Sequence, residues 1–175
     1  MTLPERKILL LAYGNPGRRD DGLGPALAAA LERLALPGVT IDVDYQLTVE
    51  DAAAIAEHDD VIFADADCSG PEPFTFGRIR PEAGVNFSSH SVSPQEVLGL
   101  AAELFGARTT GYLLGIRGHE FNEFGEGLSA RAEANLAAAL RFIQSVLRKR
   151  TFCEGFAPSD AMPAAAVSST GDRSW

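Results

Sequence analysis

Three runs of apolar residues constrain the fold of this chain more than any other feature. They are Lys7 to Tyr13 (KILLLAY), Val61 to Ala66 (VIFADA) and Thr109 to Ile116 (TTGYLLGI). Within each run the apolar residues are nearly continuous, which is typical of a strand that is buried on both faces. Such strands occur in parallel sheets that helices cover on both sides, so we expect an α/β fold.

The stretches between these runs predict helices and two further strands. Helical spacing of apolar residues, first-turn prolines and capping residues predict helices at Gly24 to Leu36, Thr48 to about His58, Ser93 to about Phe105 and Leu128 to Arg150. Strands are expected at Val39 to Tyr45, toward a sheet edge, and at Phe74 to Arg80, which we expect to be exposed. The predicted fold is a three-layer α/β/α sandwich around a mostly parallel five-stranded sheet, mixed if the last of these strands runs antiparallel.

Length and composition favour one domain. The chain has 175 residues, of which 46% are hydrophobic and 22% are charged, as in ordinary globular proteins. We expect a single α/β domain at residues 1–150. Residues 151–175 are rich in Pro, Ala, Ser and Gly without periodicity, and they are predicted to form a flexible tail.

The net charge of −9 excludes some classes of partner. Phosphate backbones and anionic lipids are bound by clustered Lys and Arg, so neither nucleic acid nor a membrane surface is expected. The apolar run near the start is too short to span a membrane and follows no signal-peptide pattern, so we expect a cytoplasmic protein. Cys68 and Cys153 form no metal-binding or disulfide pattern.

Acidic and imidazole groups fall where the predicted strands end. Asp20 and Asp21 follow the first strand, Asp65 closes the second apolar run, and His90 precedes the helix that begins near Ser93. In open α/β sheets, ligands bind outside the carboxyl ends of the strands. The glycine-rich loop at Gly14 to Gly24 matches no nucleotide-binding motif, and its two carboxylates would repel phosphate. Two carboxylates and one imidazole suit a divalent first-row metal instead.

Each of these residues also has an ordinary structural explanation. Asp20 or Asp21 can cap the following helix, Asp65 can be a turn residue, and His90 can be a surface histidine. His119 and Glu120 follow the third apolar run, but Glu123 stands where an HExxH zinc motif needs its second histidine.

Three more residues of these loops are candidates for a functional role. Phe121 and Phe124 can form a docking surface, although aromatic residues in a loop more often pack back onto the core, which is the expectation here. Cys68 lacks a basic partner nearby in the sequence, so it is not expected to act as a nucleophile.

Taken together, these motifs resemble those of the hydrogenase maturation endopeptidases. The resemblance is carried by Gly14-Asn15-Pro16 with Asp20-Asp21-Gly22-Leu23-Gly24, by Phe63-Ala64-Asp65-Ala66, by His90 eight residues before Leu98, and by Gly115-Ile116. It extends from about Lys7 to Leu147, and so leaves the C-terminal residues outside.

The resemblance implies an endopeptidase that removes a short C-terminal extension from the large-subunit precursor of a nickel-iron hydrogenase after nickel insertion. It implies that Asp21, Asp65 and His90 are both the metal-contacting and the catalytic residues, with Asp20 as the alternative to Asp21. The nickel would be recognised in the substrate and not permanently bound, and we expect the protein to act as a monomer. Water could be activated by the metal or, in the manner of an aspartyl protease, by the carboxylates. The alternative is a non-catalytic metal-sensing or chaperone module that binds the same precursor.

Overall fold

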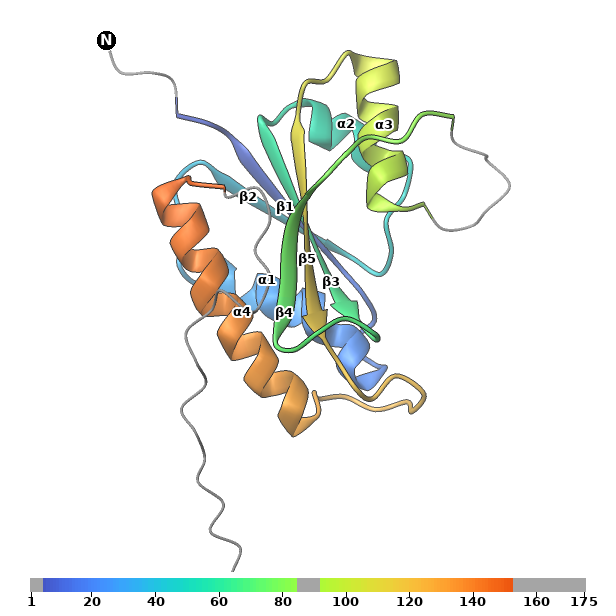
Figure 1. Cartoon of the computed structure of the whole chain (residues 1–175), viewed down its shortest axis with the longest axis vertical. Helices are drawn as coiled ribbons and strands as arrows, with labels where there is room; N and C mark the ends of the chain where they lie inside the picture. The colour runs from blue at the N-terminus through green and yellow to red at the C-terminus, as the bar shows by residue number, and fades with distance from the viewer. Residues whose placement is uncertain (1–4, 85–91, 153–175) are drawn as a thin grey trace, which may run out of the picture.

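A computed structural model describes residues 5–84 and 92–152, and its strands form one five-stranded sheet in the order β2-β1-β3-β5-β4 (Figure 1). The strands are β1 (Ile8–Tyr13), β2 (Val39–Asp44), β3 (Asp60–Asp67), β4 (Phe74–Ile79) and β5 (Thr110–Arg117). β2, β1, β3 and β5 are parallel, and β4 pairs antiparallel with β5. The expected mixed, mostly parallel sheet is therefore confirmed.

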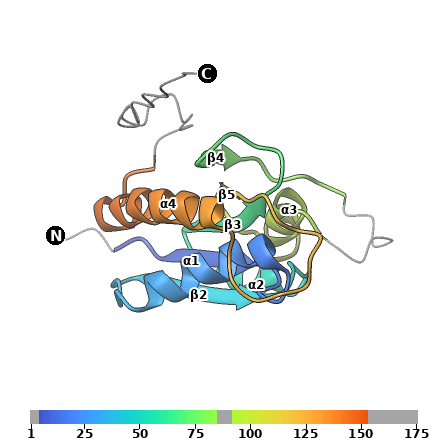
Figure 2. The same cartoon turned by 90° about the horizontal axis from the view of Figure 1, so that it is seen from below.

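Helices cover both faces of the sheet, as Figure 2 shows. The helices are the short 3-10 helix η1 (Arg19–Gly22), α1 (Leu23–Glu32), α2 (Asp51–Ala56), α3 (Pro94–Phe105) and α4 (Ala130–Lys149). Side chains of α1 and α4 share one apolar core with the sheet, and those of α2 and α3 share the other. The predicted three-layer α/β/α architecture is confirmed.

The positions of the strands follow from their sequence patterns. β1 and β3 are neighbours inside the sheet, and their buried side chains alternate between the two cores, as in a sheet covered on both faces. β2 alternates polar with apolar residues and lies at one edge of the sheet, as expected.

β4 lies at the other edge, but the expectation that it is exposed was wrong. The rings of Phe74 and Phe76 are buried against Phe142 of α4, with ring centroids 5.0 and 5.1 Å apart respectively. The amphipathic helix α4 covers this edge of the sheet, and Phe142 lies more than 60 residues after β4 in the sequence.

Two helix ends differ from the sequence prediction and one agrees. α3 begins with a complete capping box, in which Ser93 and Glu96 exchange hydrogen bonds, as predicted. At α2 only half of the expected box forms, because Asp51 accepts from the N–H of Thr48 but the Thr48 side chain does not cap the helix. The helix α1 ends at Glu32, before Leu36, and the turn that follows still packs its leucines on the core.

Within the described ranges, no helix combines the length and apolar character needed to cross a membrane. The predicted tail, apart from Thr151 and Phe152, and Cys153 lie outside the described residues.

Candidate functional site

The carboxyl ends of β1, β3 and β5 meet at one edge of the sheet, at the bottom of Figure 1, because these strands are parallel. The loop after β1 carries η1 with Asp20 and Asp21, and the end of β3 carries Asp65. The loop after β5 passes over the same edge. Hydrogen bonds from this loop to Asp20 hold it there. The structure thus brings together the acidic residues that the sequence placed at strand ends.

Asp20 is a structural residue that joins three segments of this edge. Its side chain is fully buried and accepts hydrogen bonds from the backbone N–H groups of His119, Glu120 and Ser129 and from the Ser129 hydroxyl, at 2.7 to 2.9 Å. Burial opposes ionisation of Asp20, but these bonds outweigh it and hold the pKa of the carboxyl below its ordinary value. Because both oxygens are engaged, Asp20 has little capacity left to bind a cation.

Asp21 keeps more of its carboxylate available than its neighbour does. It is half-buried, and Oδ2 accepts one hydrogen bond, from the N–H of Asn15 at 3.0 Å. The loop packs so tightly here that a Cβ on Gly14 would lie 2.0 Å from the backbone oxygen of Asp21, and Gly14 has φ of 138°. Only glycine therefore suits this position. Neither aspartate caps α1 with its side chain, since the N-cap is Gly22.

Asp65 is the most perturbed acid of the site. Burial raises its pKa to about 7, and the negative charges of Asp21 and Asp67 act in the same direction. Hydrogen bonds from the N–H of Ala66, at 2.7 Å, and from the hydroxyl of Tyr13 oppose the rise. Asp21 is therefore close enough to Asp65 for its charge to disfavour ionisation of Asp65.

Of the three predicted metal-contacting residues, His90 lies outside the described residues. Among the residues that the structure describes, no three or more His, Cys, Asp or Glu side chains are grouped to hold a metal ion. Asp21 and Asp65 lie near each other at this edge of the sheet, and the three-residue metal site stays a prediction.

Sequence reasoning missed two residues that accompany the acid pair. Tyr13, at the end of β1, is hydrogen-bonded to Asp65, and burial together with the nearby Asp65 charge raises the pKa of its hydroxyl. Arg117, at the end of β5, lies in register with Asp67 and helps to lower the pKa of that carboxyl. One guanidinium nitrogen of Arg117, Nη1, is buried without a hydrogen-bond partner among the described residues. Both residues stand at the ends of apolar strands, and this position is the sequence signal that could have identified them.

The weaker sequence candidates take other roles. The ring of His119 is bonded to Glu72, which also pairs with Arg131, so it is held away from an HExxH-type function. Phe124 is 88% exposed beside Arg18, so the expectation that it packs on the core was wrong. Cys68 is exposed and forms no disulfide.

The raised pKa of Asp65 predicts pH-dependent stability of the free protein. In the unfolded chain this carboxyl ionises near its ordinary pKa of 3.8, whereas in the folded protein it keeps its proton to about pH 7. Between these values the unfolded state binds fewer protons, so the free energy of unfolding falls as the pH rises, and above about pH 7 the loss is complete. Asp65→Asn should remove this part of the slope. Urea unfolding of both proteins at several pH values measures it, and parallel pH profiles would contradict the assignment.

Comparison with known proteins identifies solved structures that share this fold. No family model and no curated protein matches the sequence. An endopeptidase from Escherichia coli, solved in solution, is 27% identical, with a TM-score of 0.64 over 89% of this chain and 99% of that chain. The hydrogenase maturating endopeptidase HybD from E. coli is 24% identical, with a TM-score of 0.61 over 89% and 99% of the two chains. The NiFe hydrogenase maturation protease HycI from Thermococcus kodakarensis KOD1 is 24% identical, with a TM-score of 0.63 over 83% and 94%. The chain therefore has the fold of the hydrogenase maturation endopeptidases, the family that its sequence motifs resemble.

Proposed function

We propose that this protein is an endopeptidase that removes a short C-terminal extension from the large-subunit precursor of a nickel-iron hydrogenase after nickel has been inserted. The observation that carries the proposal is the pairing of Asp21 with Asp65 at the carboxyl ends of the strands, where the pKa of Asp65 is about 7. A carboxyl with that pKa can accept or donate a proton at neutral pH. The shared fold with maturation endopeptidases supports the same reaction.

In this proposal Asp65 and Asp21 contact the nickel that the precursor carries, together with His90. The metal belongs to the substrate, and it can polarise the scissile carbonyl or the attacking water. The loop fixed by Gly14 and Asp20 sets the position of Asp21, and the Tyr13 hydroxyl fixes that of Asp65. The negative charge of the carboxylates would also attract the cation electrostatically before any bond forms.

Two neighbouring carboxyl groups suit an aspartyl-type reaction as well. In such a reaction one carboxylate takes a proton from water while the other carboxyl donates one to the departing amine. Arg117 lies at the same edge, and its buried Nη1 has no hydrogen-bond partner in the described part of the chain, so we assign it to the oxygen on which negative charge develops. Comparing cleavage of nickel-loaded and metal-free precursor decides whether the nickel or the carboxylates activate the water.

The test is incubation of the purified protein with precursor, loaded with nickel or free of metal, followed by intact-mass measurement. We expect a C-terminal fragment to be released from nickel-loaded precursor alone, because the chain lacks a nucleophile-base pair among its described site residues. Cleavage of metal-free precursor at a similar rate would favour carboxylate activation and contradict nickel recognition. Binding of loaded precursor without any mass change would identify the non-catalytic module instead.

We also place the reaction in the cytoplasm and assign it to a monomer. Fractionation of cells that produce the tagged protein, and light scattering of the purified chain, measure these two properties directly.

A further inference from the structure

Exposed apolar side chains gather at the edge of the sheet that carries the acid pair. The large apolar residues that are exposed in the described part of the chain are Val43, Tyr45, Val49, Leu104, Phe105 and Phe124. The first three lie at the end of β2 or in the loop that follows it, and Phe124 lies in the loop after β5. The other two end α3 and lie at the opposite edge (Figure 1). We call Val43, Tyr45, Val49 and Phe124 the carboxyl-edge surface.

The end of β2 borders an open, largely apolar pocket of about 260 Å³. Its lining residues are Gly14, Pro16, Pro25, Val43, Asp44 and Tyr45. Gly14 and Pro16 flank Asn15, whose N–H donates a hydrogen bond to Asp21 at 3.0 Å. One loop therefore forms a wall of the pocket and also holds a carboxylate of the acid pair.

The backbone of β2 is not free to add another strand at this end. The N–H groups of Val43 and Tyr45 donate to the carboxylates of Asp42 and Asp44, at 2.9 and 2.6 Å. The carbonyl of Asp44 accepts from the N–H of Gly14, at 3.1 Å. An edge strand whose donors are occupied in this way is a poor template for a further strand. A partner that binds here meets side chains, and extension of the sheet by a second copy of this chain is disfavoured.

Phe124 is presented to solvent by a loop that is fixed on both sides of it. The N–H of Gly125 donates to the carbonyl of Gly17 at 2.9 Å, and Arg18 donates to the carbonyl of Phe121 at 3.4 Å. The guanidinium of Arg18 also lies 5.9 Å from the centre of the Phe124 ring, which is 88% exposed. Phenylalanine and arginine are enriched at protein interfaces, and a ring on a fixed loop loses little conformational entropy on binding.

The charges around the carboxyl-edge surface are mostly negative. The exposed acidic residues of the same two segments are Asp42, Asp44, Glu50, Glu120, Glu123 and Glu126. None of these carboxylates forms an ion pair with a residue that the structure describes. The neighbouring cations are Arg18 and Arg19 of the loop after β1, so the acids outnumber them. A surface of this kind fits a basic partner that also carries apolar side chains.

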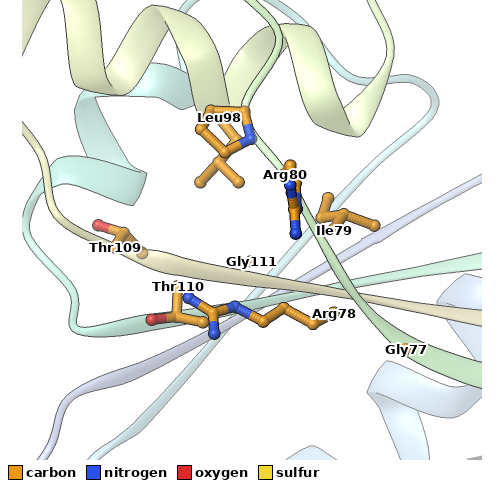
Figure 3. Close-up of a pocket in the computed structure, with 9 residues that line it drawn as sticks. Gly77, Arg78, Ile79, Arg80, Leu98, Thr109, Thr110 and Gly111 are labelled. Atoms are coloured by element: carbon orange, nitrogen blue, oxygen red, sulfur yellow. The ribbon is translucent and has the colours of Figure 1, made fainter. Parts of the chain in front are cut away.

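A groove of about 540 Å³ lies where β4 ends and β5 begins, beside Leu98 of α3 (Figure 3). Gly111 lines this groove, and Arg117 is six positions further along β5, which at about 3.3 Å per residue is about 20 Å. A partner centred on the groove would therefore be remote from the acid pair, and the groove is no part of the carboxyl-edge surface.

We propose that the carboxyl-edge surface docks the folded hydrogenase precursor through a patch of the precursor that is basic and carries protruding apolar side chains. This inference rests on the proposed function for the identity of the partner. Pockets for whole small molecules span roughly 300 to 1000 Å³, so the smaller pocket beside Tyr45 suits a single apolar side chain. Phe124 is the apolar contact that this protein contributes. Both contacts lie at the edge that carries Asp21 and Asp65, so docking brings the nickel of the precursor to the acid pair.

The first experiment measures affinity without cleavage. Surface plasmon resonance with immobilised metal-free precursor gives the Kd of the full-length protein. Phe124→Ser and Tyr45→Ser should each weaken binding about tenfold, because each removes an aromatic contact. Phe105→Ser makes the same kind of change at the opposite edge and should leave the Kd within about twofold. Thermal unfolding shows whether each variant is folded, and equal loss in Phe124→Ser and Phe105→Ser would overturn the proposal.

A charge reversal tests the chemistry of the partner. Glu123→Lys should weaken binding about threefold or more at low salt, and this difference should shrink as the salt concentration rises. Glu32→Lys makes the same change in net charge at the exposed end of α1 and should leave the Kd within about twofold. Tighter binding by Glu123→Lys, or the same loss in Glu32→Lys, would overturn a basic partner.

The last measurement links docking to cleavage. With nickel-loaded precursor, Phe124→Ser and Tyr45→Ser should raise KM about tenfold with kcat nearly unchanged, because only binding is lost. An unchanged KM would exclude the precursor as the partner of this surface. If the wild type binds precursor but cleaves none, the proposed function fails while the affinities still decide the docking surface. Self-association of the wild type that Phe124→Ser abolishes would assign the surface to a second copy of this chain instead.

Discussion

Asp65→Asn should reduce cleavage of nickel-loaded precursor by about a thousandfold while leaving the protein at least as stable as the wild type at pH 8. Asparagine keeps the shape of the side chain, but it has no charge to attract the metal and cannot exchange a proton, and such groups contribute about 10² to 10⁴ in rate. Stability should not fall, because burial makes the ionised Asp65 unfavourable in the folded protein. Initial rates from intact-mass measurement and urea unfolding give the two numbers.

Asp67→Asn is the matched control, since Asp67 lies on the same strand two residues further on. Its Oδ1 accepts the N–H groups of Ser69 and Gly70, at 2.9 and 2.8 Å, so its role is to close the turn after β3. We expect this variant to lose some stability and to keep its rate within about tenfold of the wild type. Full activity in Asp65→Asn, or equal loss in both variants, would remove Asp65 from the proposed site.

Asp20→Ala should lower the free energy of unfolding by about 3 to 5 kcal/mol, the expected cost of breaking a buried network that contains a charge. The change leaves three backbone N–H groups, those of His119, Glu120 and Ser129, without their acceptor. The pKa of Asp20 is below its ordinary value, so its stabilisation is present above about pH 4 and is lost as the pH falls. The difference between the two proteins should therefore shrink in acid.

Asp21→Ala and Ser129→Ala separate this network from simple loss of a polar group. Asp21 accepts one backbone hydrogen bond at a half-buried position, so we expect its removal to cost about 1 kcal/mol. Ser129 loses its bond to Asp20 and its cap on the N–H of Ala132, with an expected cost of about 1 to 2 kcal/mol. Urea unfolding of the three variants gives the ranking, and Asp20→Ala no more destabilising than Asp21→Ala would refute the assignment.

The contrast between Asp20 and Asp21 shows how far the sequence can be interpreted. Both residues were predicted to lie at the carboxyl edge of the sheet, because the apolar run before them and the helical pattern after them are local signals. The sequence could not predict that Asp20 is structural while Asp21 keeps its carboxylate more available. The N–H groups that donate to Asp20 are 99 to 109 residues away along the chain. Tyr13 was missed for a related reason: its hydroxyl acquires a role only when β1 and β3 become neighbours.

The burial of an edge strand and of a loop residue also could not be predicted from the local sequence. The antiparallel direction of β4 was inferred from its short connection, but its burial depends on Phe142 in a helix more than 60 residues later. Phe124 was expected in the core by the average behaviour of phenylalanine, and the loop that carries it instead leaves it exposed beside Arg18.

The hydrogen bonds of Asp20 also set an order of events during synthesis. The carboxylate that fixes the first loop finds its last partner in Ser129, at the start of α4. A nascent chain that has emerged only as far as β4 also lacks β5, which is the neighbour of β3 in the finished sheet. The segments that carry Asp21 and Asp65 can therefore be held in their final positions only after most of the domain has left the ribosome. The proposed site is therefore incomplete while the protein is being made.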